Sequence, residues 1–363
     1  MSKKSVTIII TIGTIVLLLV GFLSLRSPRP IVELKAETVF QIGGFPIANT
    51  IITSWIVIVL LTAFCFFAFR RMELVPRGLQ NFAEMAMEGF YNLVVTTAGE
   101  KHARRFFPVV ATIFFYVLVA NWLGLFPGVA TIGKVEEMRA EEEGGEILEK
   151  GFVFDKVGGM NVIMPGVPSW PPHEPGSIDL KLAEDATPAE KEAALEEATK
   201  DLGKDEKAGL LVPFLRSVNT DINSPLALAL MSAIFVEFWG ISALGFLRYG
   251  SKFVNVRRLL QGKILDGFID VFVGVLEFFA EVARIVSFTF RLFGNILAGE
   301  ILFLVILFLL PVIALDLVYG MELFVGLIQA FIFAMLTLVF GVVAVSGHGD
   351  EHETKEESPA TPS

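Results

Sequence analysis

Residues 265–310 read LDGFIDVFVGVLEFFAEVARIVSFTFRLFGNILAGEILFLVILFLL, and a second apolar stretch follows Pro311, from Val312 to Val345. A helix needs about 20 apolar residues to cross the roughly 30 Å of hydrocarbon in a bilayer. Both stretches are longer than one crossing, so we expect long helices that lie obliquely in a membrane, or helices that are broken within it. Both also carry ionisable side chains, which membrane spans rarely contain.

The rest of the chain has the composition of a membrane protein. Of its 363 residues, 54% are apolar and only 19% are charged, and the mean hydropathy is +0.66. Further apolar spans are expected at about 47–69, 106–126 and 226–247, and the mixed spacing of 78–100 predicts an amphipathic helix at the membrane surface. We therefore predict an all-α, polytopic membrane protein. Its single cysteine, Cys65, excludes an intrachain disulfide and a CxxC redox site.

The net charge of −10 is concentrated in one segment. Residues 131–210 contain 19 acidic and nine basic residues, so the remainder of the chain is neutral. A nucleic-acid-binding protein needs a basic face, and that class is excluded. We interpret the segment as a solvated acidic insert outside the membrane; collection of cations at a channel mouth is the alternative.

Local signals divide this insert further. Its centre, 164–176, is rich in Pro and Gly and predicts a loop. Thr187 and Glu190, with Pro188 at the first helical position, form a capping-box pattern. A solvated helix is therefore expected over 188–206.

We predict six segments along the chain. They are 1–46, an N-terminal apolar helix (a retained anchor or a signal) with an outer linker; 47–130, the first membrane span, the surface helix and the second span; 131–210, the acidic extramembrane insert; 211–264, a membrane span and a basic loop; 265–346, the two long apolar stretches; and 347–363, a disordered acidic tail.

The basic loops predict an orientation. Lys and Arg gather at 70–77, 101–105 and 248–263, and such loops face the cytoplasm by the positive-inside rule. The acidic insert then lies outside, and the C-terminus is cytoplasmic.

Polar groups inside the two long stretches are the main functional signal, because an ionisable group at the membrane centre costs about 2.5–3.5 kcal/mol on insertion scales. Several recur every three or four residues and so share one helix face. An internal salt bridge from Glu277 or Glu281 to Arg284 is one interpretation. Arg291 has no acid within one turn and needs a partner from elsewhere. The polar groups are Glu277, Glu281, Arg284, Arg291, Asn295 and Glu300 in the first stretch, and Glu322 and Gln329 in the second.

The chemistry of these side chains suggests their roles. A guanidinium keeps its proton in proteins, so Arg291 cannot relay protons but can attract a carboxylate and repel passing cations. Carboxyl groups such as Glu300 and Glu322 can exchange protons, and the amides of Asn295 and Gln329 can orient them. A fixed cation flanked by titratable acids is what a proton path with a barrier requires.

Two motifs in these stretches, FRLFGNILAGEILF (290–303) and LIQAFIFAMLTLVF (327–340), closely resemble subunit a of F-type ATP synthases, the membrane stator beside the rotating c-ring. The resemblance covers roughly 40–130 and 210–346, and leaves the insert and the first helix outside it. It implies that the last two stretches form a tilted helical hairpin across the c-ring. Other similar motifs are ITSWIVIVLL (52–61), VPRGLQNFAE (75–84), ANWLGLFPG (120–128) and DINSPLALAL (221–230).

The resemblance also implies roles for particular residues. Arg291 matches the essential arginine that faces the c-ring carboxylate. Glu277 and Arg284 match polar positions of the cytoplasmic half-channel. Some family members carry His at the position of Glu322, so a His-based relay is in doubt here. The outward-facing half-channel is matched by Asn295, Glu300, Glu322 and Gln329.

We therefore expect a proton-translocating stator subunit: a non-nucleotide-binding part of a proton-transporting two-sector ATP synthase in the bacterial plasma (inner) membrane. Expected partners are the c-ring, peripheral-stalk b-type subunits and the lipid bilayer; no cofactor or metal site is expected. The alternatives are a self-contained ion channel or secondary transporter, for which we find no internal repeat, and a membrane anchor without transport.

Overall fold

The computed structural model describes most of the membrane body of the chain. The described residues are 4, 11–13, 15–16, 36–137, 150–157, 160–163, 177–180, 187–200, 207–251, 253, 264–309 and 313–346. Most of the predicted first helix, the loop at 164–176, most of the basic loop at 248–263 and the tail at 347–363 lie outside these residues.

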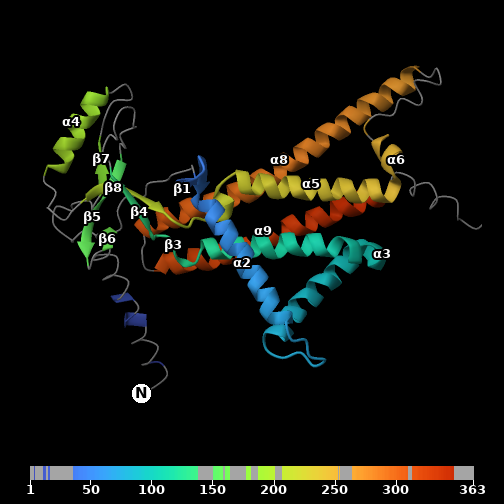
Figure 1. Cartoon of the computed structure of the whole chain (residues 1–363), viewed down its shortest axis with the longest axis horizontal. Helices are drawn as coiled ribbons and strands as arrows, with labels where there is room; N and C mark the ends of the chain where they lie inside the picture. Colours follow the sequence, from blue (N-terminus) through green and yellow to red (C-terminus); the bar gives the residue numbers. More distant parts are fainter. Residues whose placement is uncertain are drawn as a thin grey trace, which may run out of the picture. The chain divides into compact units, whose positions relative to one another are not determined.

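Within the described ranges, five helices are long and apolar enough to span a membrane (Figure 1). This confirms the prediction of a helical, multi-pass membrane protein. The two long stretches form α8 and α9, which begin and end within a few residues of the predicted limits. The five helices are α2 (Asn49–Phe69), α3 (Leu79–Gly124), α5 (Asn223–Leu244), α8 (Ile264–Leu309) and α9 (Ile313–Ser346).

Helix α3 is interrupted at Gly99, where φ is 72° and ψ is 157°. Residues with a Cβ rarely adopt positive φ, so glycine allows the chain to change direction here without strain. The break separates the stretch for which the sequence predicts a surface helix from the stretch for which it predicts a membrane span. The second part also contains Pro108.

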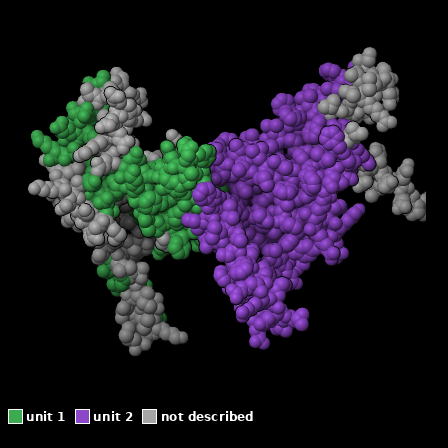
Figure 2. Space-filling view, viewed as in Figure 1, with its two compact units in different colours: residues 1–53, 123–220, 297–324 green, residues 54–122, 221–296, 325–363 purple. Residues whose placement is uncertain are grey.

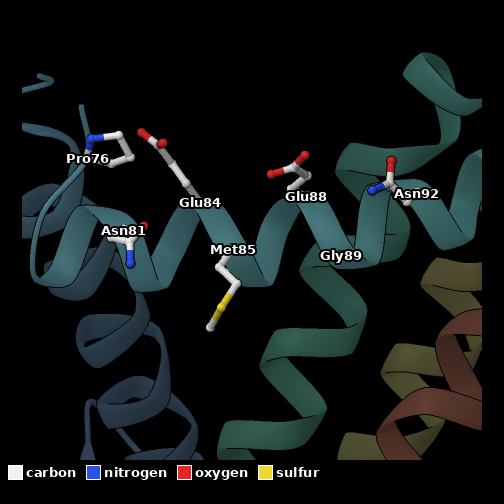
Figure 3. A pocket seen from close by; sticks show the side chains of 7 residues that line it. All are labelled: Pro76, Asn81, Glu84, Met85, Glu88, Gly89 and Asn92. Carbon is white, nitrogen blue, oxygen red and sulfur yellow. The ribbon is translucent and has the colours of Figure 1, made fainter. Parts of the chain in front are cut away.

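The first part of α3 has a polar side. An open pocket runs along it, and in Figure 3 the carboxylates of Glu84 and Glu88 project to the same side of the helix. This is consistent with a helix at the membrane surface. The pocket is lined by Pro76, Asn81, Glu84, Met85, Glu88, Gly89 and Asn92.

The acidic insert contains a β-sheet that the sequence analysis did not predict. Five antiparallel strands form it, in the order β4-β8-β5-β6, with β7 also paired to β5. Phe154, Leu210 and Val212 are buried in these strands. The strands of this sheet are β4 (Gly133–Glu137), β5 (Lys150–Val157), β6 (Met160–Ile163), β7 (Ser177–Asp179) and β8 (Lys207–Pro213), and β3 (Pro127–Ala130) directly precedes the insert.

The insert also contains α4 (Pro188–Thr199), whose capping box is as predicted. The backbone N–H of Thr187 and its hydroxyl both donate to the Glu190 carboxylate at 2.8 Å. Four further short elements are described: β1 (Thr38–Ile42) and β2 (Phe45–Ala48), which form an antiparallel hairpin, the 3-10 helix η1 (Val218–Thr220) and α6 (Phe246–Gly250).

The chain divides into two compact units, coloured in Figure 2. Unit 1 comprises 1–53, 123–220 and 297–324, and it holds the insert; unit 2 comprises 54–122, 221–296 and 325–363. The main apolar core belongs to unit 2, where Phe106 packs on Trp239 with ring centroids 4.4 Å apart. Within this core the hydroxyls of Ser232 and Thr337 are hydrogen-bonded at 2.8 Å, which links α5 to α9.

Candidate functional site

Arg291 lies on α8 in unit 2, and its side chain is exposed. Its Nη2 donates a long hydrogen bond of 3.4 Å to the Ser287 hydroxyl, and its guanidinium lies 5.8 Å from the ring centre of Phe288. Both contacts are with its own helix, one turn or less away. Among the described residues, no carboxylate forms an ion pair with Arg291.

Arg284, two turns earlier on α8, is arranged differently. Its Nη1 lies 2.6 Å from Oε2 of Glu281, and its guanidinium stacks 3.8 Å from the ring centre of Phe340 on α9. This confirms the predicted internal salt bridge, with Glu281 as the acid. Glu277, one turn before Glu281, is half-buried.

The side-chain amides of Asn295, on α8, and Gln329, on α9, are hydrogen-bonded to each other. Asn295 Nδ2 donates to Gln329 Oε1 at 3.3 Å. Gln329 is only 4% exposed, and its Nε2 is buried without a hydrogen-bond partner in the part of the chain that the structure describes. A buried side-chain amide whose NH2 group has no partner can donate to a further polar group.

Glu300 has a partner that the sequence analysis missed. In unit 1, Nε and Nη2 of Arg216 each donate to one carboxylate oxygen of Glu300, both at 3.2 Å. Arg216 is only 6% exposed. Paired hydrogen bonds from a guanidinium to a carboxylate fix the geometry as well as the charge balance. The signal in the sequence was an arginine directly after the apolar run 210–215.

Glu322 lies against the backbone of α8. The carboxyl group occupies the space that a Cβ on Gly299 would need, and Glu322 is only 6% exposed. Gly299 precedes Glu300 in the chain, so unit 1 brings Glu322 to the same turn of α8 as Glu300. Within the described ranges of the chain, no basic side chain forms an ion pair with Glu322.

A second group that the sequence analysis missed surrounds Tyr249 in unit 2. Tyr249 is 4% exposed, and its ring lies where a Cβ on Gly240 would be. Burial first, and then the negative charge of Glu237, raise the pKa of the Tyr249 hydroxyl well above its usual value. Glu281 and Arg284 also act on this hydroxyl electrostatically.

The three arginines near these acids therefore differ in one respect. Arg216 and Arg284 each hold a carboxylate of this chain, whereas the described structure gives Arg291 none. Acidic side chains lie in both units, with Glu300 and Glu322 in unit 1 and Glu277 and Glu281 in unit 2. No group of three or more His, Cys, Asp or Glu side chains that could hold a metal was found among the described residues.

Comparison with known proteins identifies the family. The family model described as "ATP synthase A chain" matches residues 51–341. ATP synthase subunit a of Gloeobacter violaceus is 27% identical over 322 residues, which cover 88% of this chain and 94% of that protein. ATP synthase subunit a of Moorella thermoacetica is 26% identical over 320 residues, which cover 87% of this chain and 99% of that protein. A match that includes all of α5 and α8 and most of α2 and α9 shows that this chain belongs to the ATP synthase A chain family.

Proposed function

We propose that this chain is the proton-translocating stator subunit of an F-type ATP synthase and provides two half-channels separated by Arg291. One observation carries the proposal: an arginine on a membrane helix is exposed and has no carboxylate partner in the described chain, while Arg216 and Arg284 both have one. A guanidinium at membrane depth needs an anionic partner, because isolated charge there is costly. A carboxylate carried by a neighbouring ring subunit meets that need.

The outer half-channel is built around Glu322 and Glu300. Glu322 is buried against Gly299 on the turn of α8 that carries Glu300, and Arg216 keeps Glu300 oriented. We assign Asn295 and Gln329, which are hydrogen-bonded to each other at 3.3 Å in unit 2, to the outer path as well. A proton from the outer side passes these groups and neutralises the carboxylate on the ring.

The neutralised carboxylate then leaves Arg291 and moves into lipid, because an uncharged carboxyl group enters hydrocarbon far more readily than an ionised one. After nearly a full turn of the ring it releases its proton to the cytoplasmic half-channel. Glu277, Glu281 and Arg284 belong to that second path. Each charge that crosses the field contributes about 2.3 kcal/mol per 100 mV.

Arg291 prevents a direct leak between the two paths, because its fixed positive charge repels a proton that attempts to pass. The partners in this proposal are a c-ring, which supplies the moving carboxylate, and peripheral-stalk b-type subunits. The membrane is the bacterial plasma membrane, with the insert outside and the C-terminus in the cytoplasm; the basic loops support this orientation.

The test is Arg291→Ala in the complete ATP synthase, reconstituted in liposomes. We expect the complex to assemble and ATP synthesis driven by a proton gradient to be lost, while Arg71→Ala, which changes an exposed loop arginine, keeps wild-type synthesis. Retained synthesis in Arg291→Ala would refute the proposal. Specific ion transport by the purified chain alone in liposomes would instead favour a self-contained channel or transporter.

A further inference from the structure

Arg216 is held through its backbone as well as through its side chain. Its N–H donates to Thr53 Oγ1 at 3.2 Å, and the Thr53 hydroxyl donates in turn to the carbonyl of Asn49 at 3.0 Å. Thr53 and Asn49 are both 0% exposed, and both lie in the first turns of α2. Thr53 and Arg216 are 163 residues apart in the chain. Together with Asn49 they form one connected set of buried groups in unit 1.

The strand that leads to Arg216 is fixed by the same helix. Asn49 Nδ2 donates to the Pro213 carbonyl at 3.3 Å. Beyond β8, the pairing with the β3–β4 segment continues, because Phe214 N–H donates to the Ile132 carbonyl at 3.0 Å and Ala130 N–H donates to the Leu215 carbonyl at 2.9 Å. The three residues directly before Arg216, which are Pro213, Phe214 and Leu215, therefore each form a hydrogen bond through a backbone group.

On the C-terminal side of Arg216 the chain passes close to the end of α3. A Cβ on Gly124 would lie 2.6 Å from Ser217 Oγ and 3.2 Å from Ser217 Cα. Because Gly124 has no side chain, Ser217 can pack closely against the end of α3. The backbone of Arg216 and of its neighbours is thus held by amide groups, carbonyls and the Thr53 hydroxyl, whereas the Arg216 guanidinium is held by Glu300.

We propose that Thr53 is a positioning residue for the outer proton path: its hydroxyl fixes the Arg216 backbone, and through it the guanidinium that orients Glu300. The inference rests on the proposed function of Glu300. Thr53 itself does not carry protons. Its hydroxyl is occupied on both sides, since it accepts from Arg216 and donates to Asn49.

The physical consequence follows from the Arg216–Glu300 pair. Without the Thr53 acceptor, a buried N–H loses its partner, and the chain shifts to satisfy it. A displaced guanidinium then interacts less with Glu300. Proton entry through Glu300 should then be slower, and the dependence of ATP synthesis on the outer-side pH should change.

The experiment compares complete ATP synthases that carry Thr53→Val or Thr53→Ser, reconstituted in liposomes. Valine keeps the shape and removes the acceptor, whereas serine keeps the hydroxyl. Thr97→Val is the matched control, because the Thr97 hydroxyl also donates to a carbonyl one turn back, that of Leu93 at 3.0 Å, and among the described residues no hydrogen bond joins it to an arginine or an acid. The rate of ATP synthesis is measured against the outer-side pH at a fixed inner pH.

We expect Thr53→Val to lower the rate about three- to tenfold, the range set by the loss of one buried hydrogen bond, and to shift the pH of half-maximal rate. Thr53→Ser and Thr97→Val should keep the wild-type profile. An unchanged profile in Thr53→Val overturns the inference, as does a slower rate at an unchanged midpoint, which a purely structural role would produce. If the complex with Thr53→Val does not assemble, Thr53→Ala, which removes the hydroxyl without added bulk, is measured instead. The same two outcomes then support or overturn the inference.

Glu300→Gln, measured in the same assay, separates this inference from the proposed function. If Glu300→Gln keeps the wild-type rate, the outer path through Glu300 fails, and the role of Thr53 fails with it. If Glu300→Gln is impaired while Thr53→Val behaves as Thr97→Val does, only the positioning role fails.

Discussion

Breaking the Arg216–Glu300 pair should slow proton entry without preventing assembly. Replacement of Arg216 by Met removes the guanidinium and keeps much of the volume of its stem. Glu300→Gln removes the charge and keeps the shape. In each single variant, the remaining partner loses its counterpart, and the double variant Arg216→Met/Glu300→Gln removes both charges together.

The structure bounds the size of the effect. Removal of one partner from a fully buried ion pair typically costs about 3–5 kcal/mol. Here the Arg216 side chain is 8% exposed but that of Glu300 is 27% exposed, and both bonds of 3.2 Å are longer than the strongest guanidinium–carboxylate bonds. We therefore expect about 2 kcal/mol for each single variant, which corresponds to about a 30-fold slower step if it limits the rate.

The assay is proton-driven ATP synthesis by the reconstituted complex, with the amount of assembled complex measured in each preparation. Because the two residues act as one pair, the double variant should be no slower than the slower single variant, which gives a coupling energy of about 1–2 kcal/mol. Additive losses, with no coupling, would refute the argument that Arg216 acts on transport through Glu300.

Three further predictions concern packing and pH. Gly299→Ala places a methyl group where the Glu322 carboxyl group lies, so that carboxyl group must move. We expect the rate of ATP synthesis to fall about tenfold, because overpacking costs about 1–3 kcal/mol. The control Gly320→Ala, which has open space around it, should keep the wild-type rate. Equal rates in the two variants would contradict this. Ser232→Ala removes the 2.8 Å hydrogen bond to Thr337, and we expect thermal unfolding of the complex to show a loss of stability of about 0.6 kcal/mol. Ser251→Ala, which removes an exposed hydroxyl bonded to the Arg248 carbonyl, should show no loss. Equal melting temperatures in the two variants would show that the Ser232–Thr337 bond does not contribute. The backbone N–H and the hydroxyl of Thr187 hold the pKa of Glu190 below its usual value, so this carboxylate stabilises the start of α4 above a pH of about 4, and the stabilisation is lost as the pH falls through the lowered pKa. Amide exchange at Lys191 should therefore be slower in the wild type than in Glu190→Gln at pH 6, and the difference should shrink as the pH is lowered; a ratio independent of pH would rule the effect out.

The long helices could be predicted because hydropathy acts locally. The limits of α8 and α9 follow from long, mostly apolar runs on either side of Pro311, and the capping box of α4 follows from Thr187 and Glu190, three residues apart. The pairing of Arg284 with Glu281 was within reach for the same reason, since residues three apart on a helix are neighbours.

What could not be predicted depends on contacts between distant parts of the chain. Arg216 lies outside any apolar helix and 84 residues from Glu300, so no periodic pattern joins them. The contacts of Thr53 and Asn49 could not be recognised from the sequence, because a threonine or asparagine that is buried in the fold looks no different there from one on an exposed helix surface. The insert strands were missed because they are short, and their pairing joins β4 to β8 across most of the segment.

The central claim is that Arg291 faces a carboxylate supplied by a moving neighbour. The most direct test is an experimental structure of the assembled complex in which the Arg291 guanidinium and its surroundings are resolved. We predict a ring-subunit carboxylate within about 4 Å of that guanidinium, the distance of an ion pair, in at least one rotational position. A guanidinium in bulk solvent, or one paired wholly within its own chain in every position, would contradict the account.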